Sequence, residues 1–290
     1  MAGRGHGGGT AGSAGRAGFT ALLALCAGVT LTFLALPLVA LFAEVPLADV
    51  PSLLSDPAVK DMLAVTARTN AIANVLIVGL GTPTAYLLAS RRFPGRSLLV
   101  TLVELPLVLP PAVAGIGLLA AFGAGGLLGA ELQDAGIVLP FSEWAVVMAI
   151  TFVASPFYVR QAIASFEGVD PQLPAAARTL GAGPARTFLR ISLPLAASGL
   201  LAGWVLAFAR GIGEFGATIM FAGNVRGVTQ TLTLGIYEQL DANFDVALAV
   251  SLLLVILSFA VLLSYKLITQ WRSSTLTSPS PVARIASGSR

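Results

Sequence analysis

Two opposite charges stand four residues apart inside one long apolar run. Arg210 and Glu214 lie within FARGIGEFGATIMFAGN, in a stretch that is otherwise uncharged. A charge at the centre of a membrane costs about 2.5–3.5 kcal/mol even on the lenient insertion scale. Residues four apart on a helix share a face, so the two side chains could neutralise each other as a structural pair. The alternative is that they border a transport route; for Glu214 we favour the structural role.

The sequence lacks the residues that ATP binding, an internal disulfide or a multi-cysteine metal site would need. Of the two lysines, Lys60 and Lys266, neither follows a glycine, so there is no P-loop for ATP. The single cysteine, Cys26, excludes an internal disulfide and any multi-cysteine metal site. The only histidine, His6, lies in a glycine-rich leader. We therefore expect no catalytic residue, no metal and no cofactor in this chain, and an enzyme of the membrane is the least favoured class.

The composition is that of a membrane protein. Of the 290 residues, 56% are hydrophobic and only 11% are charged, whereas soluble domains carry about a quarter of charged residues. Uncharged runs long enough to cross the bilayer, which needs about 20 residues, predict an all-α polytopic membrane protein with six transmembrane helices. The predicted spans lie at 17–43, between 68 and 91, at 97–122, between 143 and 160, at 192–221, and between 245 and 266. The third and fifth are expected to be irregular.

Charge predicts the orientation of these spans. The leader, the 91–96 loop, the 160–190 loop and the tail together hold thirteen lysines or arginines, against two on the other side. By the positive-inside rule, both termini then face the cytoplasm, and the chain is a multi-pass protein of the plasma membrane. The expected organisation is a disordered cytoplasmic leader (1–16), a first span (17–43), an external loop (44–64), a five-helix core (65–271) and a disordered cytoplasmic tail (272–290).

One segment between spans cannot lie in a membrane. This elbow, Asp170–Pro194, carries three arginines and several helix breakers. Gly181 suits the position just after a helix end, and Pro184 suits the first turn of the next helix, so we expect two short helices joined by a turn. The first helix could begin at Pro171 or Pro174. Such a compact basic surface suits docking of another protein; alternatively, its arginines only fix the topology.

The third span contains three prolines, at 106, 110 and 111, within LPLVLPPAVAG. Proline removes a backbone donor and kinks or breaks a helix, which a bilayer tolerates only where protein or a water-filled cavity surrounds the site. The kink either lines a pathway or serves packing alone.

The elbow resembles a known signature. The sequence AAARTLGA at 175–182, followed by ISLP at 191–194, is similar to the "EAA" motif of ABC-importer permeases. The residues that this resemblance assigns to coupling with the ATPase are Ala175, Ala176, Arg178, Thr179, Leu180, Gly181 and Ala182. The family usually has an acidic residue just before the alanines, where this chain has Pro174 and Ala175, so the charged contact of that residue is not carried over.

The fifth span indicates which group of these permeases the chain resembles. The segments GEFGAT at 213–218, AGN at 222–224 and TQTL at 229–232 are similar to molybdate permeases. Sulfate/thiosulfate permeases share the Gly-Glu-Phe-Gly core and tungstate permeases diverge more; both stay open as alternatives. The candidates for the pathway or for a helix interface are Pro110, Pro111, Arg210, Glu214, Gly216, Thr218 and Asn224.

The resemblance implies a fold and a set of partners. The fold is the transmembrane domain of a type I ABC importer, present as a homodimer in membrane lipid. Two copies of an ABC ATPase subunit would bind ATP and magnesium, and a periplasmic or extracellular oxyanion-binding protein would deliver the cargo; no nucleic acid is expected. A rival of another class is an ion-coupled secondary transporter that uses Glu214 as its ion site.

Overall fold

The computed structural model describes residues 10–45, 48 and 50–276, and every regular element in this part is a helix. The helices are α1 (Thr10–Glu44), α2 (Val50–Ser55), α3 (Pro57–Ser90), α4 (Arg96–Val108), α5 (Pro111–Phe122), α6 (Gly129–Asp134), α7 (Glu143–Glu167), α8 (Gln172–Thr179), α9 (Pro184–Thr187), the π-helix η1 (Phe188–Ser192), α10 (Leu193–Ile212), α11 (Gly216–Ala222), α12 (Leu232–Ala242) and α13 (Phe244–Leu276). The chain divides into two compact units, Met1–Pro51 and Ser52–Arg290.

The first unit consists of the predicted first span. Its apolar part, Gly18–Glu44, has 27 residues and a mean hydropathy of 2.3. The side chains along it are exposed, Cys26 among them. Helix α1 begins at Thr10, so the second half of the expected disordered leader is helical; residues 1–9 lie outside the described part.

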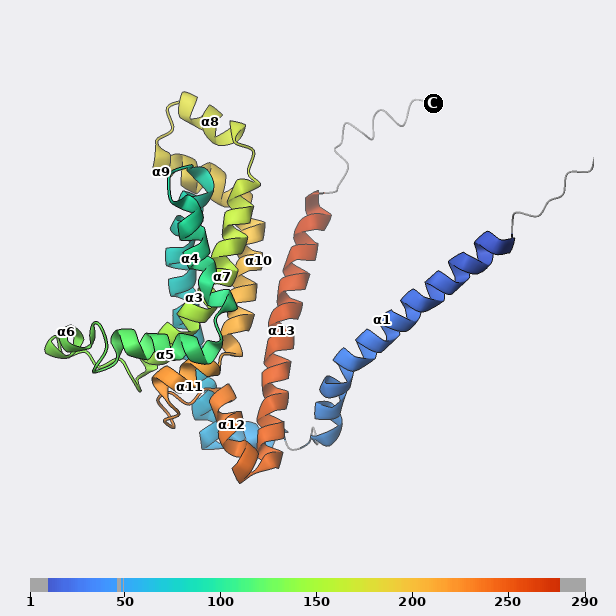
Figure 1. Ribbon diagram of the computed structural model, residues 1–290, viewed down its shortest axis with the longest axis vertical. Coiled ribbons are helices and arrows are strands. Elements are labelled where there is room, and N and C mark those ends of the chain that lie inside the picture. Colours follow the sequence, from blue (N-terminus) through green and yellow to red (C-terminus); the bar gives the residue numbers. More distant parts are fainter. Residues whose placement is uncertain (1–9, 46–47, 49, 277–290) are drawn as a thin grey trace, which may run out of the picture. The chain divides into compact units, whose positions relative to one another are not determined.

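The second unit contains the other predicted spans. Across the described residues, five helices are long and apolar enough to cross a membrane, α1 included, and the bent pair α4–α5 makes a sixth if it is one span. The fold is therefore the predicted all-α polytopic one. Figure 1 shows α8 and α9 at one end of the helices α3, α7 and α10, with α11 and α12 at the other end.

The third and fifth spans are broken rather than merely kinked. Between α4 and α5 the axis turns by 117°, because Pro110 and Pro111 follow each other and neither can donate a backbone hydrogen bond. The fifth span, expected to continue to about residue 221, ends as α10 at Ile212 and resumes as the short helix α11. Glycines at 211, 213 and 216 make this stretch a weak helix former.

Three boundaries differ from those expected. The external loop predicted at 44–64 is mostly helical, because α2 lies within it and α3 begins at Pro57, where Asp56 caps the backbone N–H of Ala58. Helix α7 continues two turns beyond Arg160, to Glu167. The last helix, α13, reaches Leu276, so the first five residues of the expected disordered tail are helical, and 277–290 lie outside the described part.

Helix α7 is the centre of the core. It packs against α3 on one side and α10 on the other, and its buried face is rich in alanine and valine. Small residues allow the backbones to approach closely, as in many membrane helix pairs. Gly203 of α10 is so close that a Cβ there would lie 3.0 Å from Cβ of Gln161, and Gly199 faces Ser165 in the same way. Gly199 and Gly203 are four residues apart and form a G-x-x-x-G motif, which joins α10 to α7.

Candidate functional site

The elbow has the predicted pair of short helices. Helix α8 begins at Gln172, directly after Pro171, and Oδ1 of Asp170 accepts the backbone N–H of Gln172 at 2.9 Å. After α8, Gly181 has φ of +83°, a conformation that suits glycine. Pro184 then occupies the first turn of α9. Both breakers act as the sequence predicts.

The motif residues of the elbow form the C-terminal part of α8 and the turn after it. Residues 175–179 lie in α8, and 180–182 make the connection to α9. Leu180 is 87% exposed and Leu173 is 47% exposed. Two exposed leucines, seven residues apart in a segment with a mostly exposed surface, form an apolar surface that another protein could cover.

An aromatic cluster fixes the elbow to the bundle. The ring of Phe188, in η1, lies 4.6 Å from that of Tyr86 in α3, and Tyr86 in turn lies 5.3 Å from Phe166 in α7 (distances between ring centroids). From η1 the chain continues without interruption into α10. The helical run Pro184–Ile212 has 29 residues, about 43 Å at 1.5 Å per residue. The end of the elbow and α10 therefore belong to one uninterrupted helical run.

At the far end of this helix the charged pair is formed as expected. A guanidinium nitrogen of Arg210 lies 2.7 Å from Oε2 of Glu214, whose side chain is only 1% exposed. The other oxygen, Oε1, accepts the backbone N–H of Ala217 at 2.7 Å. The hydroxyl of Thr233, in α12, donates to the backbone carbonyl of Glu214 at 2.8 Å. Glu214 lies just after the end of α10, and its carboxylate connects that end to the start of α11.

Helices α11 and α5 meet with almost no space between their backbones. A Cβ on Gly216 would lie 2.7 Å from Cβ of Pro111, and one on Gly115 would lie 2.6 Å from the backbone oxygen of Ala217. Pro110 caps α5 and Pro111 fills its first turn. The two broken spans therefore pack against each other at their breaks, and the prolines and Gly216 lie at one contact.

Buried polar groups surround the breaks. The hydroxyl of Thr218 is buried and has no hydrogen-bond partner among the described residues. In α3, Nδ2 of Asn74 donates to Oδ1 of Asn70 at 2.6 Å, and a Cβ on Gly211 would lie 3.0 Å from that same oxygen. These two asparagines are not among the predicted site residues, although polar residues in a membrane helix were the available signal.

Asn224 is the one candidate that lies apart from the breaks. It belongs to a loop after α11 that is organised by Glu238 of α12: the carboxylate accepts from Asn224 at 3.0 Å and from Arg226 at 2.5 Å, and also from Gln230. The hydrogen bond from Arg226 is the main reason that the pKa of Glu238 is lowered, and the same bond raises the pKa of Arg226. No local sequence pattern indicates this network, because its members lie 8 to 14 residues before Glu238.

No group of three or more histidine, cysteine, aspartate or glutamate side chains in the described part of the chain could hold a metal ion.

Known proteins resemble this chain over most of its length. The family model described as "Binding-protein-dependent transport system inner membrane component" matches residues 81–274. The Molybdenum transport system permease protein ModB of Mycobacterium tuberculosis is 46% identical over 235 residues, which cover 80% of this chain and 88% of the relative. The protein of the same name from Escherichia coli is 40% identical over 220 residues, covering 76% of this chain and 95% of the relative.

Solved structures share the fold. A chain of a bacterial ABC transporter that imports the acidic polysaccharide alginate superposes with a TM-score of 0.71 at 14% identity, covering 87% of this chain and 94% of that one. A chain of the MetNI methionine ABC transporter gives 0.54 at 19% identity, covering 73% and 93%. With the family match and the sequence identities above, the chain belongs to the binding-protein-dependent transport system inner membrane components, the multi-pass permease subunits of ABC importers.

Proposed function

We propose that this chain is the permease subunit of an ATP-driven molybdate importer. The observation that carries the proposal is the 46% identity to a molybdenum permease over 80% of the chain, which includes both the elbow and the broken fifth span. Sulfate/thiosulfate and tungstate permeases remain the alternatives within the family, and the competition test below distinguishes them.

The proposed assembly follows the family. Two copies of this chain form a homodimer, each elbow docks on one ABC ATPase subunit, and that subunit binds ATP and magnesium. A periplasmic or extracellular oxyanion-binding protein delivers the cargo. The elbow and both termini face the cytoplasm, which the distribution of lysine and arginine supports.

The proposed mechanism uses the continuous helix Pro184–Ile212. ATP closes the two ATPase subunits and moves the elbows, with Leu173 and Leu180 as apolar contacts of α8 and its turn. Because η1 and α10 are one helical run, the movement reaches the break where Glu214 joins α10 to α11. The cavity between the two chains then opens outward, and hydrolysis returns it inward. Such gating is an equilibrium between two packings that ligands bind differently.

The geometry of Glu214 disfavours the secondary transporter. An ion-coupling carboxylate must exchange its proton or ion with water, whereas the Glu214 side chain is 1% exposed, pairs with Arg210 and caps a backbone N–H. A structural pair that holds two helices together explains these contacts.

The test is transport by the reconstituted complex. Vesicles that contain the permease and its ATPase should accumulate radioactive molybdate only with ATP and the binding protein, and excess sulfate should compete poorly. Uptake by the permease alone, driven by an ion gradient, would refute the importer; strong competition by sulfate or tungstate would assign the alternative cargo.

A further inference from the structure

A second polar site lies at the elbow end of the bundle, away from the breaks. A pocket of about 560 Å³ separates α8 from the ends of α3 and α7. Its polar side chains are Tyr86, Ser90, Arg92, Arg96, Glu167, Arg178 and Ser192. Three guanidinium groups thus share the pocket with a single carboxylate, which makes it an electropositive cavity in a chain with few charges.

One of the three arginines is already neutralised. Arg96 lies 2.6 Å from Oε1 of Glu167, and its Nε donates to the backbone carbonyl of Leu88 at 2.6 Å. These bonds hold the start of α4 to α3 and α7. The Arg96–Glu167 pair is therefore part of the pocket lining, and Glu167 does not neutralise the charges of Arg92 and Arg178.

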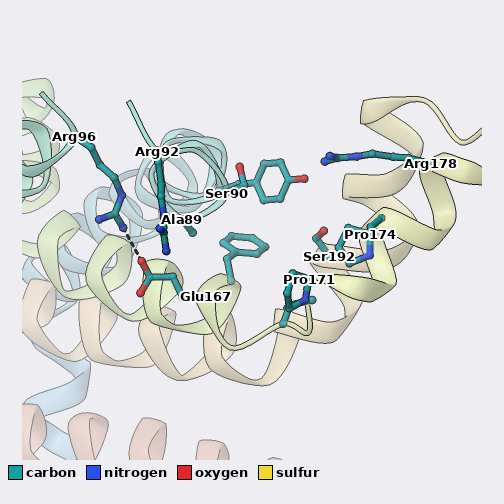
Figure 2. A pocket seen from close by; sticks show the side chains of 13 residues that line it. Ala89, Ser90, Arg92, Arg96, Glu167, Pro171, Pro174, Arg178 and Ser192 are labelled. Carbon is teal, nitrogen blue, oxygen red and sulfur yellow. Dashed lines mark hydrogen bonds and ion pairs between the residues drawn. The ribbon is translucent and has the colours of Figure 1, made fainter. Parts of the chain in front are cut away.

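The other two arginines have no partner in the described part of the chain. Arg92 and Arg178 make no hydrogen bond or ion pair there. Figure 2 shows them entering the pocket from opposite sides, Arg92 from the end of α3 and Arg178 from α8. Helical arginines are commonly paired with an acid one turn earlier, but the residues three and four positions before Arg178 are Ala175 and Pro174.

The pocket lies on the inner side of α8. Residues 171, 174, 175 and 178, which line it, have the i, i+3, i+4, i+7 spacing of one helix face. Leu173 and Leu180, the exposed apolar residues of the elbow, lie on the opposite face. A protein bound to Leu173 and Leu180 would therefore leave the pocket accessible to a small ligand.

We propose that this pocket binds a divalent tetrahedral oxyanion of the phosphate, molybdate or sulfate class between Arg92 and Arg178. Guanidinium groups bind such oxygens with paired, charge-assisted hydrogen bonds, and the hydroxyl of Ser192, which has no hydrogen-bond partner among the described residues, is a further donor at the floor. The bound ion ties α8 to the α3–α4 connection. The site is distinct from the translocation path, and the inference holds whichever oxyanion the importer carries.

The experiment measures protection of a cysteine in the pocket. The full-length chain is purified in detergent with Cys26→Ala and Ser90→Cys, and its alkylation by N-ethylmaleimide is followed at constant ionic strength. Phosphate should slow alkylation several-fold, whereas chloride at equal ionic strength should not. A second protein with Ser97→Cys, exposed nearby but outside the pocket, should react equally fast with and without phosphate.

Arginine variants assign the effect to the pocket. In Arg92→Gln or Arg178→Gln the phosphate concentration for half-protection should rise roughly tenfold, the loss of one charged hydrogen bond. Arg186→Gln, on the exposed side of α9, is the matched control and should behave as the parent. Molybdate and sulfate titrations identify the source: protection by molybdate alone means the released cargo, and equal protection by phosphate means the common cytoplasmic anion.

Three results would overturn the proposal. They are no protection by any of the three dianions, equal protection by chloride, and an equal shift in the Arg186→Gln control. Since none of these measurements involves uptake, failure here leaves the proposed molybdate transport untouched.

Discussion

The asymmetric burial of the charged pair leads to an asymmetric effect of its mutations. Glu214 is 1% exposed and Arg210 is 26% exposed. In Arg210→Ala, the buried carboxylate keeps only the N–H of Ala217 as a partner, and removal of one member of a buried pair costs about 3–5 kcal/mol. In Glu214→Gln, the side-chain oxygen can still accept that N–H, and the arginine left without its carboxylate is 26% exposed rather than buried, so we expect a smaller loss, about 1.5–3 kcal/mol.

The assay is thermal unfolding of the detergent-purified protein, with denaturant titration to obtain free energies. We expect Arg210→Ala to destabilise the chain more than Glu214→Gln, and the double variant to cost less than the sum of the two, by a coupling of about 0.5–3 kcal/mol. The matched control is Arg160→Ala: its contact with Glu104 is 3.5 Å long and both side chains are well exposed, so its loss costs about 0–1 kcal/mol.

Two outcomes would refute the reasoning. If Arg210→Ala costs no more than Arg160→Ala, the Glu214 carboxylate is not held charged by its arginine. If Glu214→Gln abolishes ATP-driven uptake while its stability stays near that of the parent, the carboxylate has a role in transport beyond joining α10 to α11.

Three further predictions concern the elbow, the break and the network around Glu238. Gly181→Leu places a side chain at φ of +83° in open space, so we expect normal insertion but ATP hydrolysis uncoupled from uptake, and unchanged transport would argue against docking there. Gly216→Leu drives a side chain into Pro111 and should cost about 1–3 kcal/mol by overpacking; a melting temperature equal to that of the parent would contradict the close approach. Because the folded-state pKa of Glu238 is lowered from 4.5, its stabilising contribution is present above that value and lost as the pH falls through the lower folded pKa. The melting-temperature difference between the parent and Glu238→Gln should therefore be constant from neutral to weakly acidic pH and vanish in stronger acid; a difference that persists there would contradict the pairing with Arg226.

Much of the architecture was predictable because it depends on local composition. A membrane helix needs a long uncharged run, and such runs are visible in a single sequence. The same applies to the elbow, where Gly181 and Pro184 act through their own backbone restrictions. The Arg210–Glu214 pair was found because its members are only four residues apart.

The breaks were only partly predictable. Prolines and glycines indicated irregular third and fifth spans, but a proline in a membrane helix can bend it slightly or end it. The choice depends on what lies alongside, and here α5 turns away by 117° to meet α11 at Gly216. Likewise, the external loop expected before α3 is largely helical because short helices can form on residues that carry no membrane-spanning pattern.

The sequence by itself determined the all-helical membrane class, the positions of the apolar runs, the basic elbow and the charged pair, since each depends on residues close together in the chain. Only the tertiary structure decided which distant groups meet: the network around Glu238, the contact between the two breaks, and the pocket that brings together Arg92, from the connection after α3, and Arg178, from α8. The physical reason is that charge and hydropathy act along the chain, whereas a binding site is formed by packing, which brings together residues whose spacing in sequence follows no period.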